Sequence, residues 1–150
     1  MTTEKYEEFA QTLEAIDDEE MRFEYILDLA KLYRDAPFPE EWMTDANLMH
    51  GCMSKVWIVD EVKEGRHYFL GHSDAAIVKG LVTMMAEAFS GLTGEELQAL
   101  TLDHIRRLNL GALTMQRQVG MMAMLKHLQA LGRSEHGSGA APGVVAGHPA

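Results

Sequence analysis

Charged and apolar residues alternate along residues 4–16 with the spacing of an amphipathic helix. The apolar positions lie three or four residues apart, so they would share one face. They are Tyr6, Phe9, Leu13 and Ile16. This pattern predicts a first helix that packs one side against a core.

A second helix is predicted directly after the first. Asp17 or Asp18 can accept hydrogen bonds from its first N–H groups. Glu19 and Glu20 then lie near the positive end of the helix dipole. Its apolar stripe consists of Phe23, Ile26, Leu27, Ala30 and Tyr33. Pro37 would end this helix, because proline cannot continue the hydrogen-bond pattern.

The pattern changes in the middle of the chain. Residues 40–51 are mixed and predict irregular structure, with a short strand near 48–49. A β-branched and aromatic run follows over 56–62. The pair Glu64-Gly65 is a turn signal, and 67–70 is a second β-type run. Together these segments predict an antiparallel hairpin.

Helical spacing returns after the hairpin. Ser73 can cap a strongly apolar helix, with Asp74 in the favourable first turn. That helix would run to Phe89 and be broken by Gly91 and Gly94. The further helices expected are 93–97, 102–108 and 113–131.

These elements predict an α+β fold in which helices flank a small antiparallel sheet of about three strands. A chain of 150 residues suits one domain with a sizeable core. We expect that domain to cover residues 1–131. Residues 132–150 consist mostly of glycine, alanine, serine, proline and histidine without apolar periodicity, so a flexible C-terminal tail is expected there.

The net charge argues against nucleic acid as the main partner. The chain carries 23 acidic and 13 basic residues, a net charge of −10, which repels nucleic-acid backbones. No apolar run approaches the length of a membrane span. The N-terminus Met1–Glu8 is acidic and resembles neither a secretory signal nor a transit peptide. We therefore expect a cytoplasmic protein without nucleic-acid or membrane partners.

Cys52 is the only cysteine. A single cysteine cannot form an internal disulfide, and it cannot supply a multi-thiolate zinc or iron–sulfur site. A lone cysteine is most often a small buried apolar residue. Here, however, Gly51 precedes it and a β-type run follows, so Gly51 would allow a tight loop to present the thiol.

Three blocks of the sequence resemble the SufE-like family of sulfur acceptors. The segment GCMSKVW, residues 51–57, resembles the family signature Gly-Cys-x-Ser-x-Val-Trp. The segment SDAAIVKGL, residues 73–81, and the pair Arg117-x-x-Gly120 are similar to two later blocks. The blocks occur in the same order, and the resemblance covers residues 4–131. Met53 and His72 depart from the family pattern, which commonly has glutamine and an acid there.

The resemblance implies a fold shared with IscU-type iron–sulfur scaffolds and a role in sulfur relay. Cys52 would take the terminal sulfur of a persulfide on a PLP-dependent cysteine desulfurase of the SufS or CsdA type. It would stimulate that enzyme and pass the sulfur to a SufBCD-like cluster scaffold or another sulfur acceptor. The chain itself would need no cofactor, because PLP belongs to the desulfurase. A monomer or weak homodimer would fit this role.

The chemistry of relay suits one thiol on a loop. A thiolate attacks the outer sulfur of the persulfide, and a second nearby cysteine would release the cargo by forming a disulfide. An unperturbed cysteine has a pKa of ~8.5, so a cationic neighbour would raise the thiolate fraction. Arg117, Lys55 and His50 are the candidate cations. We expect the thiol to be largely shielded at rest.

The predicted loop and partner surface comprises His50, Gly51, Met53, Ser54, Lys55 and Asp74. Some of the candidate residues have a plainer interpretation as well. Arg117 would be an ordinary surface charge without the resemblance, and Asp74 fits a helix start. Ser54 would hydrogen-bond within the loop. Trp57 and Tyr68 are expected to pack in the hairpin.

Four alternatives compete with relay. A cluster scaffold would draw on several cysteines. A cysteine hydrolase would pair Cys52 with a histidine, but no protease motif surrounds it. A metal site formed by His67 and His72 is disfavoured, because an odd spacing puts them on opposite faces of a strand. The strongest competitor is a non-catalytic regulator that binds a desulfurase and has a structural Cys52.

Overall fold

The computed structural model describes residues 3–33, 38–49, 54–109 and 115–133. Within these ranges the helices are α1 (Glu4–Ala15), α2 (Glu19–Tyr33), a 3-10 helix η1 (Glu40–Trp42), α3 (Ala76–Phe89), α4 (Gly94–Gln98), α5 (Leu102–Asn109) and α6 (Met115–Leu131). The strands are β1 (Leu48–Met49), β2 (Val56–Lys63), β3 (Arg66–Ser73) and β4 (Leu92–Thr93). None of the described helices is long and apolar enough to cross a bilayer.

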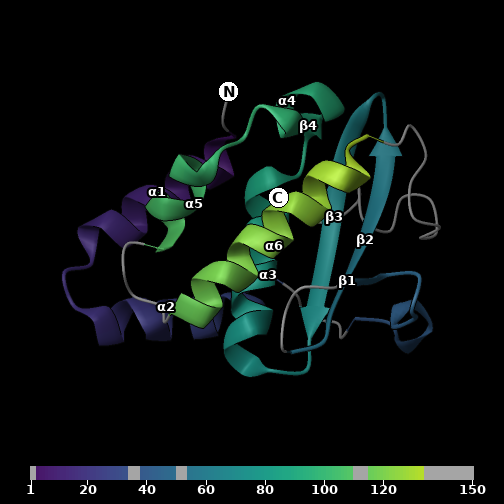
Figure 1. The fold of residues 1–150 in the computed structure, drawn as a ribbon. Coiled ribbons are helices and arrows are strands. Elements are labelled where there is room, and N and C mark those ends of the chain that lie inside the picture. The colour runs from purple at the N-terminus through teal and green to yellow at the C-terminus, as the bar shows by residue number, and fades with distance from the viewer. Residues whose placement is uncertain (1–2, 34–37, 50–53, 110–114, 134–150) are drawn as a thin grey trace.

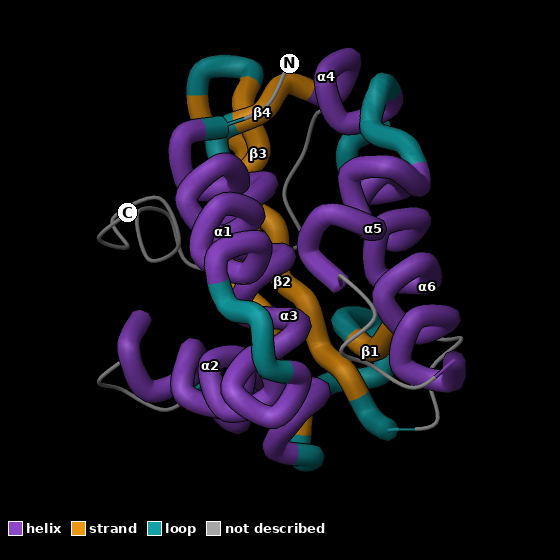
Figure 2. The backbone as a smooth tube through the Cα atoms, turned by 90° about the vertical axis from the view of Figure 1, so that its left-hand side faces the viewer, coloured by secondary structure: helices purple, strands orange, loops and turns teal. Residues whose placement is uncertain are grey.

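The helices cover one face of a single antiparallel sheet. The sheet has the order β1-β2-β3-β4, and α3 packs against it. Helices α1 and α2 pack on α3 from the side away from the sheet, while α6 lies beside α3 and α5 (Figures 1 and 2). The predicted α+β class is confirmed. The sheet has a fourth strand, β4, that the sequence did not predict. It is only two residues long, too short to show a sequence period.

The predicted hairpin is confirmed and is longer than its apolar run. Strands β2 and β3 pair along their whole length, from Val56 opposite Ser73 to Lys63 opposite Arg66. Glu64 and Gly65, which join them, have φ angles of 53° and 76°. Positive φ at both central residues matches the twist of a two-residue hairpin turn. The turn therefore fixes the register of every cross-strand pair between β2 and β3.

The register separates the side chains of the sheet into two layers. Val56 and Ile58 of β2 and Phe69 of β3 face the helices and join the main core. Val59 and Leu70 face the opposite side, where Phe38 covers them. Trp42, Met43, Trp57 and Tyr68 pack around this second cluster and are partly buried. The packing role expected for Trp57 and Tyr68 is confirmed.

Helix α3 is the centre of the main core. A methyl group placed on Gly80 would lie 2.0 Å from the carbonyl oxygen of Ile26 in α2, so only glycine allows the two helices to approach this closely. At the start of α1, the Thr3 hydroxyl donates to the Ala88 carbonyl. The ring of Tyr6 stacks on Phe89 with centroids 5.7 Å apart.

The predicted apolar stripes are confirmed in most positions. Tyr6, Phe9 and Leu13 of α1 are fully buried, while Ile16 caps the helix and is half-buried. Asp18 caps α2, accepting a hydrogen bond from the Glu20 N–H at 2.9 Å. The buried residues of the α2 stripe include Ile26 and Leu29, and Leu29 was not in the predicted set.

The predicted start of α3 is wrong by two residues. Ser73 is the last residue of β3, and the helix begins at Ala76 with Ala75 in the N-cap position and no side-chain cap. Pairing with Val56 keeps Ser73 in the strand. Asp74 therefore precedes the helix instead of lying in its first turn.

Ser90 ends α3 and also occupies part of the outer edge of β3. Its Oγ accepts a hydrogen bond from the Phe69 N–H at 2.9 Å and donates to the Ala86 carbonyl at 2.6 Å. Farther along that edge, β4 pairs with Arg66 and His67. Gly91 joins Ser90 to β4 with a φ of 93°, and its N–H donates to the His67 carbonyl at 2.7 Å.

Candidate functional site

Three strands meet at the end of the sheet where the GCMSKVW block begins. Met49 of β1 is opposite Val56 of β2, and Val56 is opposite Ser73 of β3. Residues 50–55 therefore connect two neighbouring antiparallel strands. The predicted site residues His50, Gly51, Cys52 and Met53 lie outside the described residues, and the described chain resumes at Ser54.

Ser73 anchors the carboxyl-terminal side of this connection. The Ser73 side chain is buried, and its hydroxyl donates to the Lys55 carbonyl at 2.7 Å. The same oxygen accepts a hydrogen bond from the Ala75 N–H at 3.2 Å. One buried serine thus ties the start of β2 to the segment that leads into α3.

Asn47 anchors the amino-terminal side. It is buried, and its side-chain amide donates to the Trp42 carbonyl at 2.9 Å. Its own carbonyl accepts a hydrogen bond from the Ile58 N–H at 3.0 Å. The chain on both sides of residues 50–53 is therefore held by hydrogen bonds from buried side chains.

The described members of the predicted site set gather at this end of the sheet. Ser54 is half-buried, whereas Lys55 and Asp74 are exposed and lie next to the paired residues Val56 and Ser73. Arg117 belongs to the first turn of α6, and its side chain lies outside the described structure. Its predicted position near the thiol stays a prediction.

Sequence reasoning did not predict the aromatic and buried surroundings of His72. Its imidazole stacks on Phe38 at a centroid distance of 5.4 Å and on Trp57 at 6.0 Å. Burial, with help from the positive charge of Lys79, lowers the pKa of His72. Nδ1 is buried and has no hydrogen-bond partner in the described part of the chain. The pairing of His72 with Trp57, one row from Ser73, places this neutral ring beside the candidate site.

A buried hydrogen-bonded pair, Asp60 and His67, lies nearer the turn of the hairpin, on the helix-facing side. Nδ1 of His67 is 2.9 Å from Oδ2 and 3.1 Å from Oδ1 of Asp60, and both side chains are almost fully buried. His67 and His72 thus face opposite sides of β3, as predicted. No group of three or more potential metal ligands occurs among the described residues.

Burial raises the pKa of Asp60 from 3.8 to about 6, although the hydrogen bond with His67 opposes the shift. Between these values the unfolded chain releases this proton while the native protein keeps it. Native stability therefore falls as pH rises from about 4 to about 6, by the order of 2–3 kcal/mol. Asp60→Asn should remove this component, because an amide does not titrate but still accepts a hydrogen bond from Nδ1.

Urea unfolding at stepped pH measures the effect. The unfolding free energy of the wild type minus that of Asp60→Asn should fall across this window and stay level above it. Asp45→Asn, which changes an exposed carboxyl group, is the matched control. A difference that does not vary with pH would contradict the raised pKa.

Comparisons with known proteins agree with this fold and sequence pattern. The family model "SufE: Fe-S metabolism associated domain" matches residues 7–132. An uncharacterised SufE-like protein of Synechocystis is 35% identical over 113 residues, covering 75% of this chain and 70% of that protein. A second uncharacterised SufE-like protein, from Rhizobium meliloti, is 32% identical over 120 residues, covering 76% and 84%.

One solved structure shows the same fold. The solution structure of a hypothetical protein from Thermus thermophilus matches with a TM-score of 0.71. The match covers 90% of this chain and 98% of that one, at 21% sequence identity. At this identity the likeness concerns the arrangement of helices and strands.

Proposed function

The chain belongs to the SufE family of Fe-S metabolism associated domains, and on that premise we propose that it is a sulfur acceptor. Cys52 would take sulfur from the persulfide of a PLP-dependent cysteine desulfurase of the SufS or CsdA type. Removing that sulfur would speed turnover of the desulfurase. The sulfur would then pass to an iron–sulfur cluster scaffold of the SufBCD type.

The transfer is a thiol exchange with balanced bonds. The Cys52 thiolate attacks the outer sulfur of the persulfide on the desulfurase cysteine. A new S–S bond forms on Cys52, the old S–S bond breaks, and the desulfurase cysteine leaves as a thiolate. No net oxidation occurs, so the step needs neither an oxidant nor a cofactor on this chain. Transfer to the scaffold repeats the same exchange.

The observation that carries the proposal is the anchoring of the chain around residues 50–53. The buried side chains of Asn47 and Ser73 hold the two sides by hydrogen bonds. Cys52 is three positions after Met49 in the chain, so their Cα atoms are within about 11 Å of each other. Such a short connection between fixed strands would keep the thiol at one end of the sheet, where a partner protein can approach it.

The charges at this end would assist the chemistry. Lys55 is exposed at the exit from the segment, and a nearby cation favours a thiolate. We propose Arg117 as a second cation that stabilises the thiolate or the persulfide. Because the single cysteine has no internal partner, it suits a reducing compartment, and we propose a cytoplasmic location.

Intact mass spectrometry without reductant tests the proposal. The purified protein is incubated with a cysteine desulfurase, PLP and free cysteine. We expect a mass gain of one sulfur atom or more, because a persulfide keeps the transferred sulfur on Cys52. Protein whose thiol was first blocked with iodoacetamide should gain none.

Omitting free cysteine provides a second control, since the sulfur must come from that substrate. A mass gain in the blocked protein would place the sulfur elsewhere on the chain. No gain in the unblocked protein, although the desulfurase is active, would overturn the acceptor role. Iron–sulfur absorbance of the isolated protein would point to a scaffold instead.

A further inference from the structure

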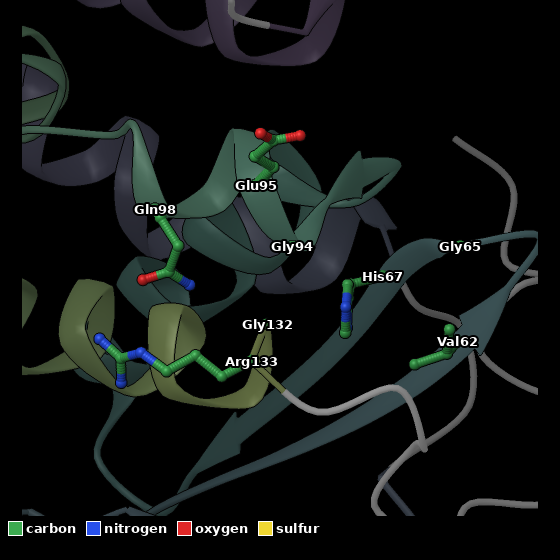
Figure 3. Close-up of a pocket in the computed structure, with 8 residues that line it drawn as sticks. All are labelled: Val62, Gly65, His67, Gly94, Glu95, Gln98, Gly132 and Arg133. Atoms are coloured by element: carbon green, nitrogen blue, oxygen red, sulfur yellow. The ribbon is translucent and has the colours of Figure 1, made fainter.

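A pocket of about 630 Å³ lies near the turn of the hairpin. Its walls come from β2, the hairpin turn, β3, α4 and the two residues that follow α6 (Figure 3). The Met49–Val56–Ser73 row lies at the opposite end of the hairpin, and eight strand residues span about 23 Å. The pocket is therefore separate from the proposed sulfur site.

The buried Asp60–His67 pair supplies the polar group of this pocket. Asp60 and His67 are 1% and 3% exposed, and Asp60 fixes the imidazole through Nδ1. The other ring nitrogen, Nε2, lies beside Gly94 in the wall of the pocket, since a methyl group placed on Gly94 would lie 3.7 Å from it. Nε2 has no hydrogen bond to any described residue.

The walls are braced against one another, so the pocket exists before a ligand enters. The Gln98 side chain of α4 donates to the Gln129 carbonyl of α6 at 2.7 Å. The Gln129 side chain donates back to the carbonyls of Leu97 and Leu100 at 3.0 and 3.1 Å. Gly94 lies so close to the Gly132 carbonyl that a methyl group would be 2.2 Å from that oxygen.

The chemistry of the pair limits the class of ligand. An imidazole that donates through Nδ1 to a carboxylate presents a lone pair at Nε2 when it is neutral. The negative charge of Asp60 behind the ring attracts cations and repels anions. Arg66, a cation on the same hairpin, is engaged by Glu96 at 3.6 Å and donates to the Gly91 carbonyl. Such a site favours a positively charged hydrogen-bond donor.

The charged side chains at the mouth of the pocket are turned away from His67. Glu95 is exposed there, and its carboxylate points away from His67 (Figure 3). The guanidinium of Arg133 points away from His67, toward Gln98 (Figure 3). Val62 adds an apolar wall. The volume lies within the usual range of small-molecule pockets.

We propose that this pocket binds a small primary amine, whose ammonium group donates a hydrogen bond to Nε2 of His67 while its carbon chain contacts Val62. The site goes beyond sulfur acceptance and does not depend on it. The proposed amine site uses no side chain from residues 50–53.

Histidine ring ¹⁵N NMR of the full chain tests the site at neutral pH. Propylamine, acetate and propyltrimethylammonium are titrated separately across millimolar concentrations, the range expected for ligands of this size. Propylamine should shift the ring signals of His67 until the shift reaches a plateau at high concentration. The signals of His104, outside the pocket, should not change. Acetate has the wrong charge, and the quaternary ammonium ion has no N–H to donate.

Three variants complete the test. Val62→Phe fills the pocket from its wall and should weaken propylamine binding about tenfold or more, whereas Val62→Ala, which only shortens the contact with the carbon chain, should weaken it less. Glu95→Gln should weaken binding less than Val62→Phe, because Glu95 lies at the mouth. The proposal is overturned if propylamine leaves His67 unmoved, if Val62→Phe binds it as well as the wild type, or if acetate or the quaternary ion shifts His67 equally.

Discussion

Cys52→Ser is expected to abolish the stimulation of desulfurase turnover. The rate at which residue 52 accepts sulfur should fall on the order of 100-fold or more. Serine is close to cysteine in size, so the surrounding chain should fold as before. Its hydroxyl group is a far weaker nucleophile near neutral pH and cannot hold sulfur as a persulfide. The measurement is the rate of alanine release from free cysteine, with and without this protein.

The neighbouring Ser54→Ala supplies the matched control, because it alters the same segment and leaves the thiol in place. It should retain most of the stimulation. Equal stimulation by Cys52→Ser and the wild type would contradict relay. That result would identify the chain as a regulator that binds the desulfurase and has a structural Cys52.

Gly80→Ala is expected to destabilise the protein by about 3–5 kcal/mol. Alanine has the higher intrinsic helix propensity by roughly 1 kcal/mol, so local preference alone predicts stabilisation. The added methyl group would lie 2.0 Å from the Ile26 carbonyl oxygen, however, and 2.9 Å from its carbon. Helices α2 and α3 would have to separate, which would loosen the packing around Ile26. Urea unfolding measures the change.

Gly71→Ala is the matched control for this substitution. Its methyl group would lie 2.5 Å from Cγ2 of Val82, the end of a side chain that can shift more easily than backbone. We expect a smaller loss than for Gly80→Ala. A Gly80→Ala protein as stable as the wild type would mean that α2 and α3 do not approach as closely as described.

Local signals in the sequence predicted the hairpin and most helices. The turn residues Glu64 and Gly65 sit between two β-type runs, and the apolar positions of α1 recur at helical spacing. The predicted start of α3 was wrong because Ser73 suits a helix cap and a strand end equally. Its pairing with Val56, which is 17 residues away in sequence, decides between them. Strand β4 has two residues, too few for any period to appear.

The family was predictable because three blocks in order carry its signal: residues 51–57, residues 73–81 and the pair Arg117-x-x-Gly120. The roles assigned to Cys52 and Arg117 stay predictions. The contacts of His72 and of Asp60 were not predictable, because they depend on register. Asp60 and His67 become neighbours only when β2 and β3 pair as observed, and His72 meets Phe38 only when Phe38 folds over the sheet.

The hydroxyl group of Ser90 has a consequence for self-association. By bonding to the Phe69 N–H, it occupies a backbone donor on the edge of β3 that another copy of the chain could otherwise use to extend the sheet. Strand β4 occupies the edge near Arg66 and His67. Intermolecular strand addition there would have to displace both. The fold thus protects this edge against aggregation at high concentration without a long edge strand.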